Sequence, residues 1–403
     1  MNNMDQRKNI PQIRLAGFSD EWARRNVGEL LIERIELSPK SNEYPLMAFI
    51  ANEGVAPKGD RYDRSALVND TEGKLYKKTE QGDFIYSSNN CESGSIGLNN
   101  YGNATISPVY SIFKPSALGV SDFLGQRLIR KDFIKEMVKW RQGVIYGQWR
   151  IHESDFAKIV VCVPDVNEQH RIGVFLRHID SLIIDNEMTL EKIHTFKKSM
   201  LEKMFAREGE CIPQIRFNGF SGNWNRRKIG DCFYERTEFD PYGELLSVTI
   251  GSGIKKFADL GRRDNSNVNK SKYKKVAIGD IAYNSMRMWQ GASGYSPYNG
   301  IVSPAYTVIA PVSGIDSKFF SYMFKREDMI HTFQARSQGI TSDNWNLKFP
   351  ALSEIEISLP SELSEQRKIA DYLGQFDNLI LAYQHELQKL NSLKKALLEK
   401  MFV

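Results

Sequence analysis

The sequence predicts an α+β fold in which two related mixed α/β domains are each followed by a long helix, and the two helices pair as an antiparallel coiled coil. Three observations predict it. The chain repeats itself, each copy ends in a proline-free stretch with helical periodicity, and both stretches carry a heptad pattern of apolar residues. At 403 residues the chain is also longer than one hydrophobic core usually supports.

The chain is an internal duplication. PQIRLAGFSDEWARRNVGE, from Pro11, recurs as PQIRFNGFSGNWNRRKIGD, from Pro213, with more than half of the positions identical. Further pairs follow in the same order: GDFIY and GDIAY, ISPVY and VSPAY, RQGVIYGQW and RSQGITSDNW, VPDVNEQHRI and LPSELSEQRKI, and LEKMF twice. Copies of roughly 195 residues are far longer than the about 20–45 residues of a solenoid repeat. Each copy is therefore expected to be a domain with an appended element.

Each copy changes character at a proline, Pro164 or Pro360. Upstream, glycine, asparagine, serine and aromatic residues alternate with short β-prone runs, which is typical of a mixed α/β domain. Downstream, residues 168–205 and 365–402 contain no proline and one glycine each, and their apolar residues recur at helical spacing. The predicted boundaries are 1–163 for the first domain, 164–210 for the first helix, 211–359 for the second domain and 360–403 for the second helix.

Both predicted helices carry apolar residues at alternating spacings of three and four, the heptad pattern of a coiled coil. Polar residues enter the pattern at Asn186 and Lys197 of the first helix, and Lys394 interrupts it in the second. Antiparallel pairing is expected because the first helix leaves the first domain and reaches the second after only residues 206–212. The alternative is that each helix packs on its own domain, but the matched pattern favours pairing. The expected seam positions are Leu176, Ile179, Ile183, Leu190, Ile193, Leu373, Phe376, Ile380, Leu387, Leu390 and Leu397.

The charge distribution suits a polyanionic partner in one region. The chain has 54 basic and 49 acidic residues, a net charge of +5, and so mild an excess matters only where basic residues cluster. Residues 255–275 hold eight basic and two acidic residues, whereas 58–83 in the first copy holds six of each. The alternative interpretation of the run is a solvated loop. Candidate phosphate contacts are Arg262, Arg263, Lys270, Lys272 and Lys274.

Several function classes are disfavoured by features that the sequence lacks. No apolar run approaches the roughly 18–20 residues of a membrane span and the first residues lack a signal-peptide core, so a cytoplasmic protein is expected. The four cysteines form no CxxC pair, which argues against a zinc site or a disulfide framework. An NPPY-type methyltransferase tetrad, a GxxxxGK[ST] loop and an HExxH zinc pair are all missing. We expect no catalytic residue, metal or cofactor in this chain.

This organisation resembles the specificity subunit of type I restriction-modification enzymes, over nearly the whole chain. The resemblance rests on the GD strand entry, the SP-x-Y step, the QG…W segment, the EQ helix start and the LEKMF ending, in the same order twice. It implies two target recognition domains that each read one half of a split site in double-stranded DNA. It also implies spacer helices that dock two methyltransferase subunits, with restriction subunits in the full complex. S-adenosylmethionine, ATP and Mg²⁺ would then belong to those partners, and this chain would not be an enzyme.

The stretches after the two GD strands, SSNNCESGSIG and NSMRMWQGASG, are rich in side chains that suit base edges. Asparagine and glutamine match adenine, and arginine matches guanine. Candidate base-reading residues are Asn89, Asn90 and Ser93 in the first domain and Arg287 and Gln290 in the second. Candidates in the QG…W segments are Arg141, Gln142, Arg336, Gln338 and Asn344. The alternative for all of them is hydrogen bonding within loops, and Trp149 and Trp345 are more often packing residues.

Two other hypotheses from different classes stay open at this point. The chain could be the recognition half of a cryptic DNA methyltransferase or nuclease, in which case the purified chain would methylate or cleave DNA. It could instead be a coiled-coil scaffold whose globular domains bind proteins. Salt-sensitive binding to duplex DNA would separate that scaffold from a DNA-reading subunit.

Overall fold

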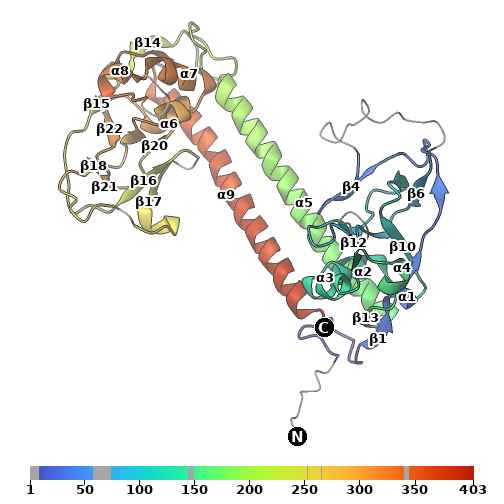
Figure 1. Cartoon of the computed structure of the whole chain (residues 1–403). Helices are drawn as coiled ribbons and strands as arrows, with labels where there is room; N and C mark the ends of the chain where they lie inside the picture. The colour runs from blue at the N-terminus through green and yellow to red at the C-terminus, as the bar shows by residue number, and fades with distance from the viewer. Residues whose placement is uncertain (1–8, 58–73, 144–148, 252, 265, 340–344) are drawn as a thin grey trace. The chain divides into compact units, whose positions relative to one another are not determined.

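The structure is a computed structural model that describes residues 9–57, 74–143, 149–251, 253–264, 266–339 and 345–403. The chain divides into two compact units, Met1–Glu187 together with Glu386–Val403, and Met188–His385. Each unit thus holds one globular domain, the first half of one long helix and the last part of the other. Figure 1 shows the helices and strands of both units.

The first unit is built from short strands and four short helices before its long helix begins. Its elements are β1 (Ala23–Asn26), α1 (Val27–Leu30), β2 (Leu31–Glu33), β3 (Leu37–Ser38), β4 (Ala48–Ile50), β5 (Gly54–Ala56), β6 (Tyr76–Thr79), β7 (Phe84–Tyr86), β8 (Ile96–Leu98), β9 (Ala104–Ile106), β10 (Ser111–Pro115), α2 (Ser121–Leu128), α3 (Lys131–Val138), β11 (Gln142–Gly143), β12 (Trp149–Arg150), α4 (Glu153–Phe156), β13 (Val160–Val163) and α5 (Val166–Lys203). Helix α5 continues into the second unit.

The second unit repeats this order. Its elements are β14 (Asn225–Lys228), η2 (Ile229–Asp231), β15 (Phe233–Glu235), β16 (Leu246–Thr249), β17 (Gly253–Lys256), η3 (Phe257–Leu260), β18 (Lys274–Val276), β19 (Ile281–Asn284), η4 (Met288–Gln290), β20 (Ser293–Tyr295), β21 (Gly300–Val302), β22 (Tyr306–Pro311), α6 (Ser317–Met323), α7 (Glu327–Arg336), α8 (Phe349–Ser353), β23 (Glu356–Leu359) and α9 (Leu363–Lys400). The predicted α+β class with two long helices is confirmed.

The largest sheet and the terminal ribbon of the two units correspond strand by strand. A four-stranded antiparallel sheet has the order β2-β10-β7-β8 in the first unit and β15-β22-β19-β20 in the second. A two-stranded ribbon, β1 with β13 and β14 with β23, joins the start of each domain to the strand before its long helix. The duplication in sequence is therefore a duplication in topology.

Each domain core includes the start of the helix that follows it and the end of the other helix. In the first unit, Leu176 of α5 and Phe402 at the end of α9 pack in one cluster with Trp22. In the second unit, Leu373 of α9 and Phe205 at the end of α5 lie in the corresponding cluster. The two LEKMF segments thus supply an aromatic side chain to a domain core.

The long helices run antiparallel, as charged contacts within each unit show. In the first unit, Lys394 of α9 lies 2.6 Å from the Asp180 carboxylate of α5. In the second unit, Lys197 of α5 pairs with Asp377 of α9. Higher numbers in α5 thus meet lower numbers in α9. Two of the polar interruptions in the heptad pattern are explained, because each has a carboxylate on the opposite helix.

The expected seam positions differ in burial along the helices. Four of them are buried in the domain cores, Leu176, Ile179, Leu373 and Leu397, and Ile380 is buried outside those clusters. Those farther along are half-buried: Ile183, Leu190, Ile193, Phe376, Leu387 and Leu390. Packing on a domain and helix pairing therefore both occur, at different places. None of the described helices is long and apolar enough to span a membrane.

The glycine in each long helix lies against its own domain. A Cβ at Gly173 would come within 2.7 Å of the Asp122 Cβ and 2.9 Å of a backbone nitrogen in α2. At Gly374 the nearest atom is the Lys318 ammonium nitrogen, 2.9 Å away at the end of a flexible side chain. The first glycine is required by a close helix approach, and the second is not.

Candidate nucleic-acid interface

The loops that follow β7 and β19 share one backbone framework. Both loops, 87–95 and 284–292, close through the same hydrogen bonds between backbone N–H and carbonyl groups. The matched bonds are Asn90 to Ser87 (3.2 Å) and Arg287 to Asn284 (2.9 Å), Ser95 to Asn90 (2.9 Å) and Ala292 to Arg287 (3.1 Å), and Ser87 to Ser95 and Asn284 to Ala292 (both 2.8 Å). Two loops of different sequence thus have the same shape.

Each loop packs on the domain core through one buried side chain and contains one glycine with a positive φ. Cys91 and Met288 occupy matched positions and are both fully buried. Burial raises the pKa of the Cys91 thiol, so this cysteine is a packing residue at neutral pH. Gly94 and Gly291 have φ values of +96° and +78°, which residues with a Cβ rarely adopt.

The predicted base-reading residues of the first loop are all exposed, but two of them have structural partners. The Asn89 side-chain oxygen accepts a hydrogen bond from the Trp149 N–H at 2.7 Å. The Ser93 hydroxyl donates to the Asn90 carbonyl at 3.0 Å. Among the three, only the Asn90 side chain has no hydrogen bond within the part of the chain that the structure describes.

In the second loop, Arg287 and Gln290 are exposed and their side chains form no ion pair or hydrogen bond with other described residues. Between them, Trp289 donates its indole N–H to the Met286 carbonyl at 3.1 Å. Its ring also meets that of Trp345 edge-on, with the centroids 5.2 Å apart. The tryptophan is a packing residue that leaves its two polar neighbours free.

The QG…W segments lie against these loops. In the first domain this segment supplies the paired strands β11 and β12. The N–H of Ile151, just after β12, donates to the Ser88 hydroxyl at 3.0 Å. In the second domain, residues 338 and 346 form the matching bridge, and the Leu347 N–H donates to the Ser285 carbonyl at 2.8 Å. The fold thus brings together the two segments that the repeat singles out.

The polar candidates of these segments differ in their freedom. The Arg141 guanidinium donates to the Ser88 carbonyl and pairs with Glu92 at 2.6 Å, so it holds the first loop in place. Gln142 donates to the Asp155 carboxylate at 3.1 Å. Arg336 and Gln338 are exposed. Asn344 lies outside the described residues.

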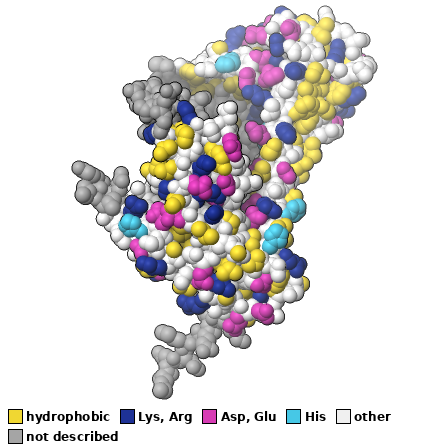
Figure 2. Space-filling view, turned by 90° about the vertical axis from the view of Figure 1, so that its right-hand side faces the viewer, with side chains coloured by type: hydrophobic (Ala, Val, Ile, Leu, Met, Phe, Trp, Pro, Cys, Tyr) yellow, Lys and Arg dark blue, Asp and Glu magenta, His cyan; other side chains and the backbone are white. Residues whose placement is uncertain are grey.

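The basic run 255–275 is less positive than its own composition indicates. Three of its lysines pair with glutamates that precede the run: Lys256 with Glu244 at 3.0 Å, Lys274 with Glu235 at 3.5 Å and Lys275 with Glu238 at 2.9 Å. A window on the sequence misses these partners because they lie outside the run, in β15 and in the segment between β15 and β16. Arg262, Arg263, Lys270 and Lys272 form no ion pair with other described residues. On the face that Figure 2 shows, acidic and basic side chains are interspersed.

The repeated GD and EQ motifs have structural roles that sequence reasoning did not identify. The aspartates of the two GD motifs, Asp83 and Asp280, are buried and form ion pairs with arginines. Their partners directly follow β2 and β15: Arg34 lies 2.8 Å from Asp83, and Arg236 lies 2.7 Å from Asp280. Burial raises the pKa of Asp83, and Arg34 opposes that shift. These ion pairs set the entry of β7 and β19, the strands that lead into the two loops.

The EQ pair fixes each long helix to its own domain. Glu168 accepts two hydrogen bonds from Arg14, both at 2.7 Å, and Glu365 accepts two from Arg216, at 2.7 and 2.8 Å. The following glutamine, Gln169 or Gln366, bonds the backbone just before α2 or α6. Two charge-assisted bonds to one carboxylate hold both the position and the direction of the helix start.

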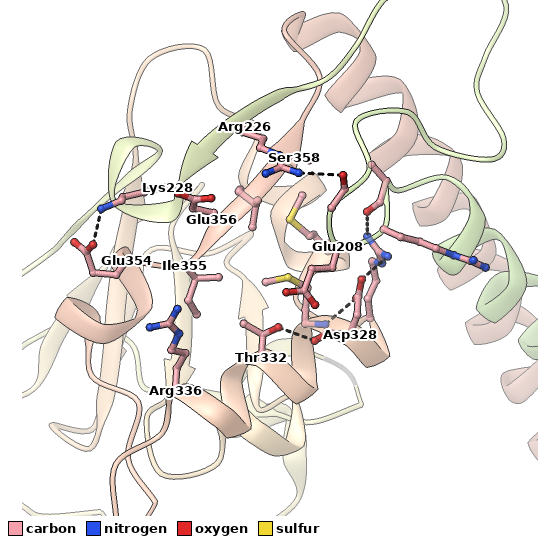
Figure 3. A pocket seen from close by; sticks show the side chains of 17 residues that line it. Glu208, Arg226, Lys228, Asp328, Thr332, Arg336, Glu354, Ile355, Glu356 and Ser358 are labelled. Atoms are coloured by element: carbon pink, nitrogen blue, oxygen red, sulfur yellow. Dashed lines mark hydrogen bonds and ion pairs between the residues drawn. The ribbon is translucent and has the colours of Figure 1, made fainter.

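A cavity of about 600 Å³ lies between the β14–β23 ribbon and α7 in the second unit. Figure 3 shows Lys228 paired with Glu354 at one edge and Asp328 and Thr332 on the α7 side, with Arg336 also on its wall. A matched cavity of about 440 Å³ in the first unit is lined by Arg24, Asp132 and Trp140, among others. Both carry mixed charges, so they favour no single class of ion.

The comparisons with known proteins agree with one another. The family model "Type I restriction modification DNA specificity domain" matches residues 222–394. The type I restriction enzyme MjaVIII specificity subunit of Methanocaldococcus jannaschii is 27% identical over 289 residues, which is 67% of this chain and 66%, just under two thirds, of that relative. The crystal structure of the S subunit of a type I restriction-modification system from M. genitalium aligns with a TM-score of 0.60 at 16% identity, covering 98% of this chain and 99% of that one.

A further solved structure, the HsdS subunit from Thermoanaerobacter tengcongensis, aligns with a TM-score of 0.44 at 15% identity, over 94% of this chain and 96% of that one. The family model covers the second domain and most of its helix, and the first copy repeats the same motifs on the same structural joints. The M. genitalium structure shows that the whole fold is shared. Residues 222–394 therefore match the type I restriction-modification DNA specificity domain, and the chain as a whole is similar in sequence and in fold to the specificity subunits of such systems.

Proposed function

We propose that this chain reads a bipartite, asymmetric DNA site, with each domain contacting one half through its loop and the adjoining QG…W segment. The observation that carries this proposal is the shared backbone framework of loops 87–95 and 284–292. A common scaffold with different exposed side chains is what two readers of different sequences need. Base specificity comes from side chains at groove edges, while the scaffold only positions them.

The individual roles follow from which side chains are free. Asn90 is proposed to read an adenine edge, and Arg287 and Gln290 to read guanine and adenine edges. Asn89, Ser93, Arg141 and Gln142 are proposed to line the first reading surface while holding its shape, and Arg336, Gln338 and Asn344 to lie beside the second. Phosphate contacts are assigned to Arg262, Arg263, Lys270 and Lys272, with a weaker contribution from Lys274 because Glu235 already pairs with it.

The domain boundaries of the sequence stay part of this proposal: 1–163 and 211–359 are the target recognition domains, and 164–210 and 360–403 are the spacer helices. The helices are proposed to dock two methyltransferase subunits, with restriction subunits in the full complex. S-adenosylmethionine, ATP and Mg²⁺ would be bound by those partners, since the sequence of this chain carries no motif for them.

Outward-facing apolar side chains on both helices support a docking role. On α5, Ile184 and Met188 are 54% and 49% exposed, and on α9, Leu379 and Leu381 are 46% and 53% exposed. These residues lie off the seam and outside the domain cores. Exposed apolar side chains that recur along a helix mark a surface for another protein.

The test is an exchange of loop 284–292 for the corresponding loop of another family member, in the chain assembled with the methyltransferase of its own system. Methylated adenines are then mapped genome-wide. We expect one half of the recognised site to change while the other half and the gap stay the same. The matched control exchanges 87–95 and should change only the other half. If either exchange altered both halves, independent reading by the two domains would be refuted.

A further inference from the structure

A half-buried lysine links the second reading loop to the helices behind it. Lys325 lies in the turn between α6 and α7. Its ammonium group donates to three backbone carbonyls: that of Ile250 at 3.0 Å, that of Ser293 at 2.8 Å, and that of Gly291. An ammonium group has three N–H donors, so all three are satisfied by carbonyl oxygens.

The three carbonyls belong to two segments that are far apart in sequence. Ile250 is in the turn after β16, Gly291 closes the reading loop 284–292, and Ser293 begins β20. One cation therefore connects three places: the turn after β16, the end of the reading loop where β20 begins, and the α6–α7 connection. Gly291 is also the residue whose positive φ turns the chain back from the exposed side chains.

The charge on Lys325 has no carboxylate partner among the described residues. Burial, together with the smaller effect of the positive charge on Lys197 of α5, lowers the pKa of Lys325 to about 8. Burying an ammonium without a counterion costs free energy. A residue that is costly for folding and uses every donor on loop carbonyls is better explained by the geometry it enforces.

The first domain holds its loop differently. Ile129 occupies the position that corresponds to Lys325, since α3 and α7 begin two residues after each of them. There the cation comes from Arg141, which donates to the carbonyl of Ser88 within the loop. The two loops thus have the same backbone framework but depend on different cations.

We propose that Lys325 is a positioning residue that sets the orientation of loop 284–292 and thereby the sequence discrimination of the second domain alone. This inference rests on the proposed function, because it assumes that the loop reads DNA. Removing the three bonds would let the loop adopt other orientations, so that the side chains of Arg287 and Gln290 no longer meet one base edge in a fixed geometry.

The experiment compares Lys325→Met with the matched control Ile129→Met, each assembled with the methyltransferase of its own system. Methylation rates are measured on the cognate site and on duplexes with one base pair changed in either half. For Lys325→Met we expect discrimination at one half to fall about tenfold, through a higher KM with kcat nearly unchanged, while the other half keeps its wild-type discrimination. Ile129→Met should leave both halves unchanged.

The outcomes separate this inference from the proposal beneath it. If the wild-type complex shows no discrimination at either half, the proposed function fails. If the wild type discriminates and Lys325→Met does so equally well at both halves, or loses both together, the positioning role is refuted. Should Lys325→Met not fold, Lys325→Gln, which keeps two N–H donors on a shorter side chain, replaces it with the same half-restricted loss expected.

Discussion

Each long helix should be held to the domain it reaches by one aromatic ring. Phe402 is 5% exposed, and its ring centroid lies 5.3 Å from that of Phe123 and 6.2 Å from that of Trp22, with the Arg130 guanidinium 5.4 Å from it. Replacing a buried phenylalanine by alanine costs about 3–5 kcal/mol. A loss of 1 kcal/mol in the free energy of unfolding lowers the melting temperature of a unit of this size by about 2–4 °C. Phe402→Ala should therefore lower the melting temperature of the first unit by roughly 6 to 20 °C.

The second unit offers the mirror experiment. Phe205 is 1% exposed and lies 4.8 Å from Phe319, ring centroid to ring centroid, and Phe205→Ala should destabilise the second unit by a similar amount. Calorimetry gives the transitions, and hydrogen exchange at β7 and β19 assigns them to units. The control is Phe175→Ala on the exposed face of α5, with a change within about 0.5 kcal/mol. Equal shifts of both transitions by either core variant would contradict the reasoning.

Three further predictions concern the helices and Lys325. Gly173→Ala should destabilise the first unit despite alanine's better helix propensity of about 1 kcal/mol, because its Cβ meets α2 at 2.7 Å, whereas Gly374→Ala should be neutral or stabilising; thermal melts decide the sign. Because folding lowers the pKa of Lys325 from 10.5 to about 8, the unfolded chain binds more protons than the folded chain between these pH values. The free energy of unfolding of the wild type should therefore rise, relative to that of Lys325→Met, by up to about 3 kcal/mol as pH increases through this window. Urea titrations measure this difference, and a difference that does not change with pH would refute the prediction. Ile184→Asp should weaken binding of the methyltransferase subunit with little change in melting temperature, as pull-down and melting of the same variant would show.

Much of the architecture is visible in the chain alone because duplication and periodicity are local patterns. The repeated PQIR and EQ segments mark matched joints, and the heptad spacing marks two helices that lie at 166–203 and 363–400. The first begins two residues before the proline-free stretch 168–205 because Asp165 caps it, its carboxylate accepting hydrogen bonds from the N–H groups of Asn167 and Glu168. Such capping depends on one side chain and shifts a boundary without changing the pattern.

The roles of individual polar residues depend on contacts between segments far apart in sequence. Arg141 and Arg287 are equally plausible base readers by residue type, yet the first is bound to loop 87–95 and the second is free. Lys274 and Arg262 belong to one basic run, but a glutamate from another strand pairs only with the lysine. Composition and spacing along the chain reveal which elements form, because helices and strands are stabilised by near neighbours. Whether a charge is available to a ligand depends on which distant group reaches it first, and that is set by the packing of the folded chain.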